Sequence, residues 1–372
     1  MNNLFDYITW RGDLDFTQSP FNPVDNIIFS QLSYLPLDGI VPGLDTKDEI
    51  SVSLAAEIFT ERHQSGDTGI AQALMYKEDP ALISAMGSSR RFGNCRLRGY
   101  VNHIDTNREM QFSALCVMTG DKSCFIVYRG TDLTLVGWKE DFNMSFKEVI
   151  PAQIEGVYYL EQMASMIKGP LRIGGHSKGG NLAVYAAALC RNKIQKRITA
   201  IYSNDAPGFH KNVIASDGFA AVKDRIHSFV PRSSIVGMLL EHSCDYSVIH
   251  SSRTGLLQHE LYSWGVTYND MIHVDEVTQG SRFVDKTLKE WIGNLNVAQR
   301  EQFFDALYAI LSASQAKSLY EIESSWFTAT RRIIKSLGHI DESTKALIHK
   351  TLAALVSAAR KNIDTLLKPG KE

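Results

Sequence analysis

Two kinds of hydrophobic spacing follow one another along the chain and predict different elements. In the segments 24–34 and 50–86, apolar residues recur every three or four positions, which predicts helices, with a break at Gly66 in the second segment. Alternation of apolar and polar residues follows and predicts three strands, over 95–104, 110–118 and 123–127. The chain is therefore expected to begin with a helical part, 24–86, that leads into a sheet.

Beyond these strands, predicted helices and strands take turns. A helix over 152–168 precedes a short apolar strand around Leu171 and Ile173, and a helix rich in small residues follows over 178–190. Three further strands are expected, over 198–202, 225–230 and 246–249. Because strands that alternate with helices form parallel sheets with right-handed crossovers, the predicted fold class is α/β, with a central, mostly parallel sheet flanked by helices.

After residue 280 the pattern is helical throughout. Asn296 and Gln299 have the spacing of a capping box in front of an apolar stripe. We therefore expect an α/β domain over 1–280 and a C-terminal helical extension over 281–372. The last part of the extension, 331–372, has nine Lys and Arg against four Asp and Glu. This mild excess favours a solvated helix face over docking to a membrane surface.

The motif Gly175-x-Ser177-x-Gly179 joins the predicted strand at Ile173 to the following helix. A strand before the motif and a small-residue helix after it are the context in which such a serine acts as a nucleophile. Small neighbours allow a tight, strained turn that raises the hydroxyl above the sheet. The N–H groups at the start of the helix can then receive an oxyanion. Ser177 is therefore the candidate nucleophile.

Composition narrows the class of protein. Of 372 residues, 44% are hydrophobic and 22% are charged, and the net charge of −2 gives no electrostatic footprint for nucleic acid. We expect no signal peptide and no membrane helix, because the start lacks the required pattern and no apolar run approaches about 20 residues. The five cysteines are scattered without C-x-x-C spacing, which is typical of reduced, mostly buried thiols. A cytoplasmic protein is expected.

A serine hydroxyl needs a base to take its proton, and the chain has 11 histidines. The order Ser, Asp, His along the chain favours a histidine that follows the last strands. Four histidines lie between the strand 225–230 and the helical extension: His242, His250, His259 and His273. His259 is the first choice because it lies in a loop-like entry to an aromatic run, and His250, at the end of the strand 246–249, is the second. We expect His176, beside the serine, to be structural.

The acid that orients the base has two candidates. Asp205 follows the strand after the Ser177 unit and lies at the same predicted edge of the sheet. Asp245 is the alternative, because it is close in sequence to His250.

The oxyanion donors are expected to be the N–H of Lys178, the residue after the nucleophile, and that of Thr131, in the loop after the strand 123–127. The cationic side chain of Lys178 opposes the helix dipole. It is therefore expected either to contact a carboxylate or substrate, or to extend into solvent.

Several motifs together resemble a known group of enzymes. Tyr128-Arg129-Gly130-Thr131 and the elbow 175–181 look like class 3 lipases of the α/β-hydrolase fold, and the fuller resemblance is to the bacterial Mbeg1-like family. The latter covers roughly 24–270 and includes three further segments: 203–209, 230–237 and 258–264. It implies an α/β-hydrolase fold and a lipase-like hydrolase.

By position, the resemblance supports Ser177 as nucleophile, His259 as base, and Thr131 and Lys178 as oxyanion donors. The chain departs from class 3 lipases after Phe229, where the aspartate of those lipases is missing. This departure favours Asp205 as the acid.

The leading hypothesis is a serine hydrolase that cleaves carboxylic esters through an acyl-enzyme on Ser177, with a lipid or other small-molecule ester as substrate. Thioesters or amides could take the place of esters, because the same groups serve all three. No metal or cofactor is implied. The alternative is a catalytically inactive binding protein that keeps the fold and uses its helical extension to engage a partner. A peptidase is the least favoured hypothesis, because no segment resembles a peptide-binding propeller.

Overall fold

The computed structural model describes residues 1–305 except 133, 239, 241–243, 297 and 304, together with the single residues 346, 353 and 357. The chain divides into two compact units. The first unit comprises Met1–His103, Phe112–Gly130 and Pro151–Val277, and the second comprises Ile104–Gln111, Thr131–Ile150 and Thr278–Glu372. Most of the extension expected over 281–372 lies outside the described residues, so its separation from an α/β domain over 1–280 stays a prediction.

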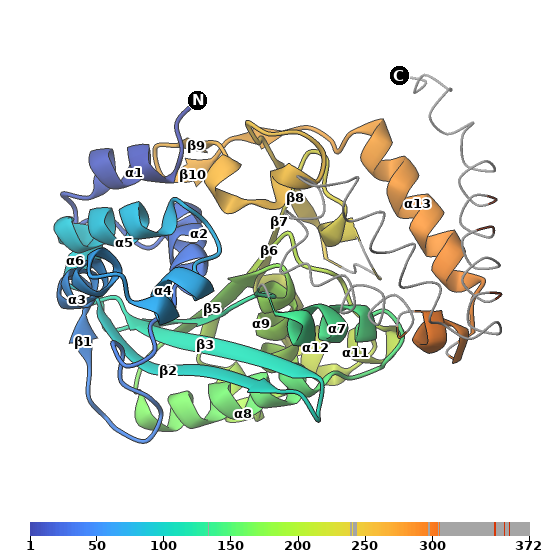
Figure 1. The fold of residues 1–372 in the computed structure, drawn as a ribbon, viewed down its shortest axis with the longest axis horizontal. Coiled ribbons are helices and arrows are strands. Elements are labelled where there is room, and N and C mark those ends of the chain that lie inside the picture. Colours follow the sequence, from blue (N-terminus) through green and yellow to red (C-terminus); the bar gives the residue numbers. More distant parts are fainter. Residues whose placement is uncertain are drawn as a thin grey trace. The chain divides into compact units, whose positions relative to one another are not determined.

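A mixed sheet runs through the first unit (Figure 1). Within the described residues it has nine strands in the order β1-β2-β3-β4-β5-β6-β7-β8-β11. The bounds are β1 (Ile50–Ser51), β2 (Arg96–Asp105), β3 (Met110–Met118), β4 (Cys124–Tyr128), β5 (Leu171–His176), β6 (Ile198–Asn204), β7 (Ile226–Pro231), β8 (Tyr246–Ile249) and β11 (His273–Val274). Neighbours from β4 to β8 are parallel, whereas β1, β3 and β11 pair antiparallel with β2, β4 and β8. The predicted fold class, a mostly parallel sheet flanked by helices, is confirmed.

Parallel pairing aligns the carboxyl ends of the central strands. His176, the last residue of β5, is level with Asn204, the last residue of β6. Asn204 is in turn level with Phe229 of β7. Ser177 and Asp205 are each one residue beyond a strand end, so they leave the sheet at the same edge, where ligands of α/β sheets bind.

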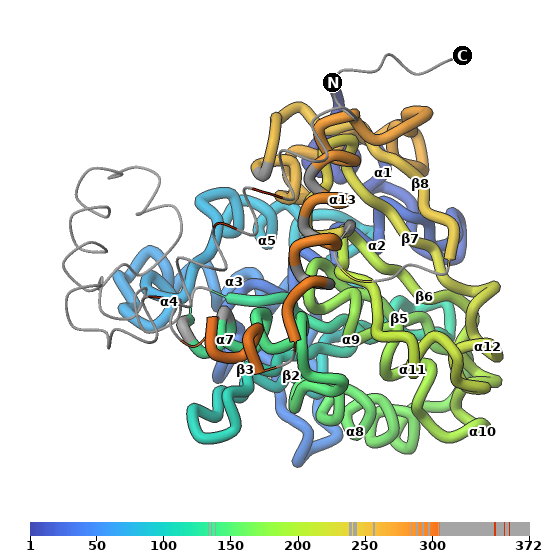
Figure 2. Tube along the Cα trace, turned by 90° about the vertical axis from the view of Figure 1, so that its right-hand side faces the viewer, coloured from blue at the N-terminus to red at the C-terminus, as the bar shows by residue number. Residues whose placement is uncertain are grey.

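Helices cover both faces of the sheet in the first unit. One layer contains α1 (Leu4–Arg11), α2 (Pro23–Leu32), α3 (Val52–Gln64), α5 (Asp79–Ser88) and α6 (Arg90–Gly93), and the other contains α8 (Pro151–Met166), α9 (Lys178–Leu189) and α12 (Asp217–Val222). Both views show α8 on the side of the sheet away from α2 (Figures 1 and 2). Strand β4 shows the same division: Phe125 and Val127 pack under α2, whereas the Tyr128 hydroxyl donates to the Gly156 carbonyl of α8 at 2.9 Å.

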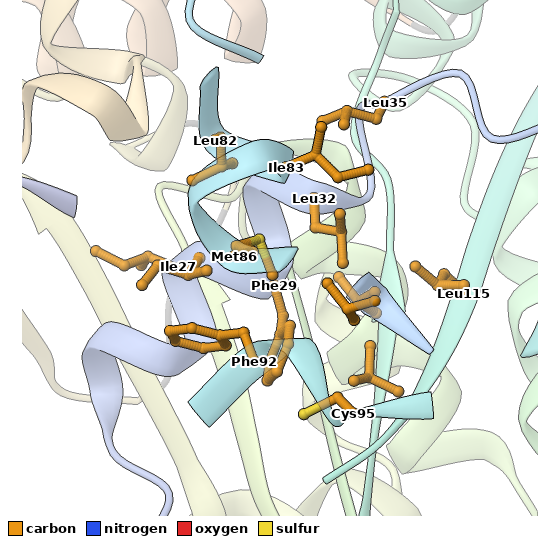
Figure 3. Close-up of a cluster of buried hydrophobic side chains, with 14 of the residues drawn as sticks. Ile27, Phe29, Leu32, Leu35, Leu82, Ile83, Met86, Phe92, Cys95 and Leu115 are labelled. Atoms are coloured by element: carbon orange, nitrogen blue, oxygen red, sulfur yellow. The ribbon is translucent and has the colours of Figure 1, made fainter. Parts of the chain in front are cut away.

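A hydrophobic core fixes α2 against the sheet and the neighbouring helices (Figure 3). Phe29 of α2 is fully buried, and its ring centroid lies 5.5 Å from that of Phe92 and 5.8 Å from that of Phe125. Met86 of α5 and Leu115 of β3 belong to the same cluster. Burial of each such side chain stabilises the fold by about 1.5–3 kcal/mol. The position of α2 matters for the site because Asn26 of α2 exchanges amide hydrogen bonds with Asn204, the last residue of β6, at 2.8 and 3.0 Å.

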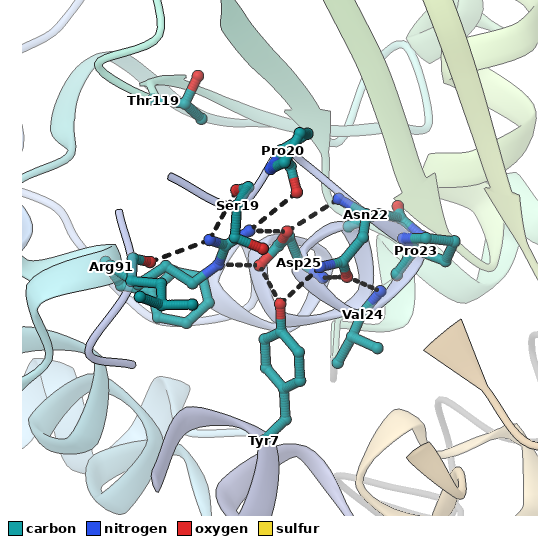
Figure 4. Close-up of polar contacts among 12 residues, drawn as sticks. Tyr7, Ser19, Pro20, Asn22, Pro23, Val24, Asp25, Arg91 and Thr119 are labelled. Atoms are coloured by element: carbon teal, nitrogen blue, oxygen red, sulfur yellow. Dashed lines mark hydrogen bonds and ion pairs between the residues drawn. The ribbon is translucent and has the colours of Figure 1, made fainter. Parts of the chain in front are cut away.

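The start of α2 carries a buried ion pair (Figure 4). Arg91 Nη2 lies 2.6 Å from Asp25 Oδ2, and both side chains are fully buried. The Tyr7 hydroxyl donates to Asp25 Oδ1 at 3.0 Å, and the Asn22 amide donates to the Tyr7 oxygen at 2.7 Å. Arg91 also donates to three main-chain carbonyls, those of Leu14, Ser19 and Pro20. The network therefore ties the N-terminal segment to α2 and α6.

The second unit, taken by itself, contains α7 (Leu135–Asn143) and α13 (Gln279–Gly293). Lys139 of α7 lies 3.9 Å from Glu109 Oε1 and forms a close ion pair with Asp305. Arg300 donates to the Ser145 carbonyl at 3.3 Å. These contacts join the strand-connecting turn, α7 and the segment after α13 within one unit.

Most of the predicted elements are confirmed where the structure describes them, with ends that differ by a few residues. The helical segment predicted over 50–86 differs more: its first two residues form β1, and a second break separates α4 (Thr68–Ala73) from α5. The helix predicted over 152–168 is α8, and the capping box at Asn296 and Gln299 forms both of its hydrogen bonds. Helices α1, α6, α7 and α12 lie outside the predicted segments, although Asn3 and Asp6 form a capping box at the start of α1. Within the described residues, no helix combines the length and apolar character needed to cross a bilayer.

Candidate active site

Ser177 occupies the sharp turn between β5 and α9. Its backbone has φ 56° and ψ −131°, a conformation that is costly for a residue with a side chain. The Ser177 N–H donates to the Asn204 carbonyl of β6 at 2.9 Å, and the Ser177 carbonyl accepts from Gly180 at 3.0 Å, which begins the helix. The turn is therefore held from both sides, as required of a strained residue that keeps one conformation.

Glycines make this turn possible because main chains meet closely around it. A Cβ on Gly179 would lie 2.1 Å from the Tyr128 carbonyl oxygen, and one on Gly175 would lie 2.5 Å from the same atom. Gly130, two residues after β4, also faces the turn: a Cβ there would lie 3.2 Å from Ser177 Cβ and 2.2 Å from the Tyr34 hydroxyl. The chain after β4 thus passes directly beside the serine.

Asp205 lies one residue beyond β6 and is 1% exposed. Its N–H donates to the Phe229 carbonyl at 2.7 Å. Oδ1 accepts from the Ser234 hydroxyl at 2.5 Å and from the Gly237 N–H at 3.1 Å. Both donors come from the segment after β7. The segment 232–237 therefore supplies two hydrogen bonds to the acid at the end of the preceding strand.

His259 ends a short helical turn, η3 (Gly255–His259), and pairs with Asp205. Its Nδ1 lies 2.6 Å from Asp205 Oδ2. The His259 carbonyl accepts from His176 Nε2 at 2.8 Å, and the two imidazole centroids are 4.3 Å apart. Because Asp205 follows the last residue of β6 and His176 is the last residue of β5, the His259 ring lies beside the ends of both strands, and β5 leads directly into Ser177. The His259 side chain is 24% exposed, so part of it faces solvent.

The segment that carries His259 is cross-linked within itself. The Ser251 and Ser263 hydroxyls are 2.7 Å apart, and the Ser252 N–H donates to the Ser263 carbonyl at 2.8 Å. The indole N–H of the buried Trp264 donates to the Gln258 carbonyl at 2.8 Å. These bonds bring both ends of the segment together, so the position of His259 does not depend on a long free loop.

The competing candidates are not joined to this arrangement. Asp245 is exposed, and His250 Nδ1 is buried without a hydrogen-bond partner among the described residues. His242 lies outside the described residues. Among the two acids and two bases left open by the sequence, the structure brings together Asp205 and His259.

The two expected oxyanion donors lie in different units. Lys178 is the first residue of α9, and its side chain is 1% exposed, so the expected extension into solvent does not occur. Thr131 is the residue after Gly130 and begins a segment of the second unit. Within that unit its hydroxyl donates to Asp141 Oδ2 at 2.5 Å. The donor roles of both residues remain proposals.

Within the part of the chain that the structure describes, no group of three or more His, Cys, Asp or Glu is placed so that it could hold a metal ion. Four cysteines are buried, and Cys244 is partly buried. None of the five occupies the strand–helix turn.

Fold and site together define a class. A mostly parallel sheet, a serine at a strained strand-to-helix turn, and an Asp–His pair contributed by later segments characterise the α/β-hydrolase fold. A Rhizomucor miehei lipase–propeptide complex is similar, at 15% identity and a TM-score of 0.34, over 53% of this chain and 66% of that chain, just under two thirds of its length. The M37 lipase is similar at 15% identity and a TM-score of 0.35, over 57% of this chain and 69% of that chain.

The sequence places the chain within a narrower group. The model of the Mbeg1-like family matches residues 86–309, which is more than half of the chain. The chain belongs to the Mbeg1-like family. The match begins and ends later than the resemblance traced over 24–270. No curated protein matches the chain.

Proposed function

We propose that the chain is a serine hydrolase that cleaves carboxylic esters, of the lipase or esterase type, through an acyl-enzyme on Ser177. One observation carries the proposal: His259 is hydrogen-bonded to the buried Asp205 carboxylate at 2.6 Å, and its ring centroid lies 4.3 Å from that of His176, the residue before Ser177, which has a positive φ. Serine, imidazole and carboxylate in this arrangement perform acyl transfer on several unrelated folds.

The hydrogen bond to Asp205 fixes the chemistry of His259. A carboxylate only accepts, so His259 Nδ1 carries the proton and Nε2 keeps its lone pair. Nε2 takes the proton of the Ser177 hydroxyl as its oxygen attacks the ester carbonyl, and the Asp205 carboxylate stabilises the imidazolium that forms. The imidazolium then gives this proton to the departing alcohol. Water, deprotonated by the same Nε2, attacks the acyl-enzyme and releases the acid.

The negative charge of the tetrahedral intermediate needs donors near Ser177. We assign these to the N–H of Lys178, in the first turn of α9, and to the N–H of Thr131. The amides of a first helical turn lack partners within the helix, and the chain at Gly130, which precedes Thr131, passes beside the serine. Each such donor contributes about 3 kcal/mol to transition-state stabilisation.

A fluorophosphonate probe tests the proposal, because it phosphonylates only an activated serine. We expect labelling of the full-length protein and its loss in Ser177→Ala, whereas Ser165→Ala, an exposed serine of α8, labels like the wild type. A series of p-nitrophenyl esters of increasing chain length then defines the acyl preference. Absence of labelling in folded protein contradicts the proposal and favours the catalytically inactive binding protein.

A further inference from the structure

His176 lies directly before Ser177 and is buried, with 2% of its surface exposed. Both ring nitrogens have partners: Nδ1 lies 2.9 Å from the Tyr34 hydroxyl, and Nε2 lies 2.8 Å from the His259 carbonyl oxygen. Tyr34, just after α2, is 3% exposed, and its ring packs edge-on to the His176 ring at 5.8 Å. The imidazole therefore bridges the N-terminal helical layer and the segment that carries His259.

The partners determine the tautomer of His176. A main-chain carbonyl can only accept, so Nε2 must carry the proton. Nδ1 is then the acceptor, and the Tyr34 hydroxyl is its donor. Burial, followed by the neighbouring His259, lowers the pKa of His176 well below its usual value of 6.5. The ring therefore stays neutral in the folded protein. The His259 carbonyl selects the Nε2–H form, and the Tyr34 hydroxyl holds that form in place by donating to Nδ1.

This tautomer acts on His259 through the main chain. Asp205 holds the His259 ring at Nδ1, and His176 holds the carbonyl of the same residue. These two contacts fix the ring and the backbone of one residue, which determines the direction of Nε2, the remaining ring nitrogen. A neutral His176 also adds no positive charge at 4.3 Å from a ring that must itself become positive during the reaction.

We propose that His176, held as its Nε2–H tautomer between the Tyr34 hydroxyl and the His259 carbonyl, is a positioning residue that directs His259 toward Ser177. The expected effect on kcat rests on the proposed function, whereas the expected effect on the position of the His259 ring does not. It also gives a purpose to Gly130, since any side chain there would displace the Tyr34 hydroxyl.

Three variants test the inference. Tyr34→Phe removes the hydroxyl that holds the His176 ring at Nδ1. His176→Leu removes both hydrogen bonds of the ring, and His176→Gln keeps an N–H donor the same number of bonds away from Cα. The matched control is Tyr159→Phe, which removes an equally buried hydroxyl that donates to the Gly99 carbonyl at 2.8 Å. The spectroscopic measurement is the low-field NMR resonance of the His259 Nδ1 proton, which requires no turnover.

We expect Tyr34→Phe and His176→Leu to shift or broaden this resonance and to lower kcat at least tenfold with KM changed less than twofold. His176→Gln should keep the resonance and most of kcat, and Tyr159→Phe should leave both as in the wild type. An unchanged resonance and unchanged kcat in Tyr34→Phe overturn the inference, even if His176→Leu fails to fold. If the resonance changes in the variants but neither the wild type nor any variant cleaves esters, the proposed function fails and the positioning role of His176 holds.

Discussion

Replacement of Asp205 by asparagine tests the site most directly, because it changes one atom and keeps the shape. Asp205 Oδ1 accepts from Ser234 and Gly237, so the oxygen of the new amide remains on that side. The amide nitrogen must then take the position of Oδ2, 2.6 Å from His259 Nδ1. Two N–H groups cannot face each other at this distance. The His259 proton therefore moves to Nε2, where it prevents that atom from accepting the proton of Ser177.

The loss follows from the wrong tautomer rather than from a broken fold. In serine triads this change lowers kcat about 10⁴-fold, which corresponds to about 5 kcal/mol in the activation free energy. We expect Asp205→Asn to reduce p-nitrophenyl ester hydrolysis by about 10³–10⁴-fold and to slow fluorophosphonate labelling in parallel. Because both hydrogen bonds to Oδ1 are kept, the melting temperature should change by no more than about 4 °C.

The control is Asp245→Asn, which alters the exposed acid that the sequence left as an alternative. This variant should retain wild-type activity. Wild-type activity in Asp205→Asn would refute the assignment of Asp205 as the acid. If Asp245→Asn lost activity instead, Asp245 would be the acid.

Three further variants examine the surroundings of the site. Gly130→Ala should lower kcat at least tenfold, as measured with the same esters, because the added methyl group meets the Tyr34 hydroxyl and the turn at Ser177; full activity would contradict this. Arg91→Met should lower the free energy of unfolding in urea by about 3–5 kcal/mol, because it leaves the Asp25 charge buried and unpaired; a smaller loss would mean that water reaches Asp25. Burial raises the pKa of Asp79 to about 6. The folded state thus binds a proton that the unfolded state releases at lower pH, so stability should fall as the pH rises from about 4 to about 6, and Asp79→Asn should flatten this slope in urea titrations.

The turn at Ser177 could be predicted from the sequence because the residues that form it are neighbours along the chain. The strand, the serine between glycines and the start of the small-residue helix are all contained within a dozen residues, 171–182. The parallel pairing of the central strands follows from the alternation of strands with helices along the chain. The role of Asp205 could be predicted for a related reason: Asp205 follows a strand, and the carboxyl ends of parallel strands lie at the same edge of a sheet.

Other parts of the site have no local signal. The contact between Tyr34 and His176 joins residues 142 positions apart, and neither neighbourhood indicates the other. The hydroxyl of Ser234 likewise donates across 29 positions, to a carboxylate on another strand. The choice between His250 and His259 also required coordinates, because it depends on how the segment after β8 closes on itself. His176 was expected to be structural, and the structure adds that it touches the candidate base.

The fluorescence of Trp264 should depend on whether the segment around His259 is closed. Its indole is fully buried and bonded to the residue that precedes the imidazole, so any opening of the segment must expose the ring to water. Its emission would then shift to longer wavelength. Because Trp264 is hydrogen-bonded to the residue before His259, its fluorescence should indicate, without any added label, whether the segment that carries His259 is closed.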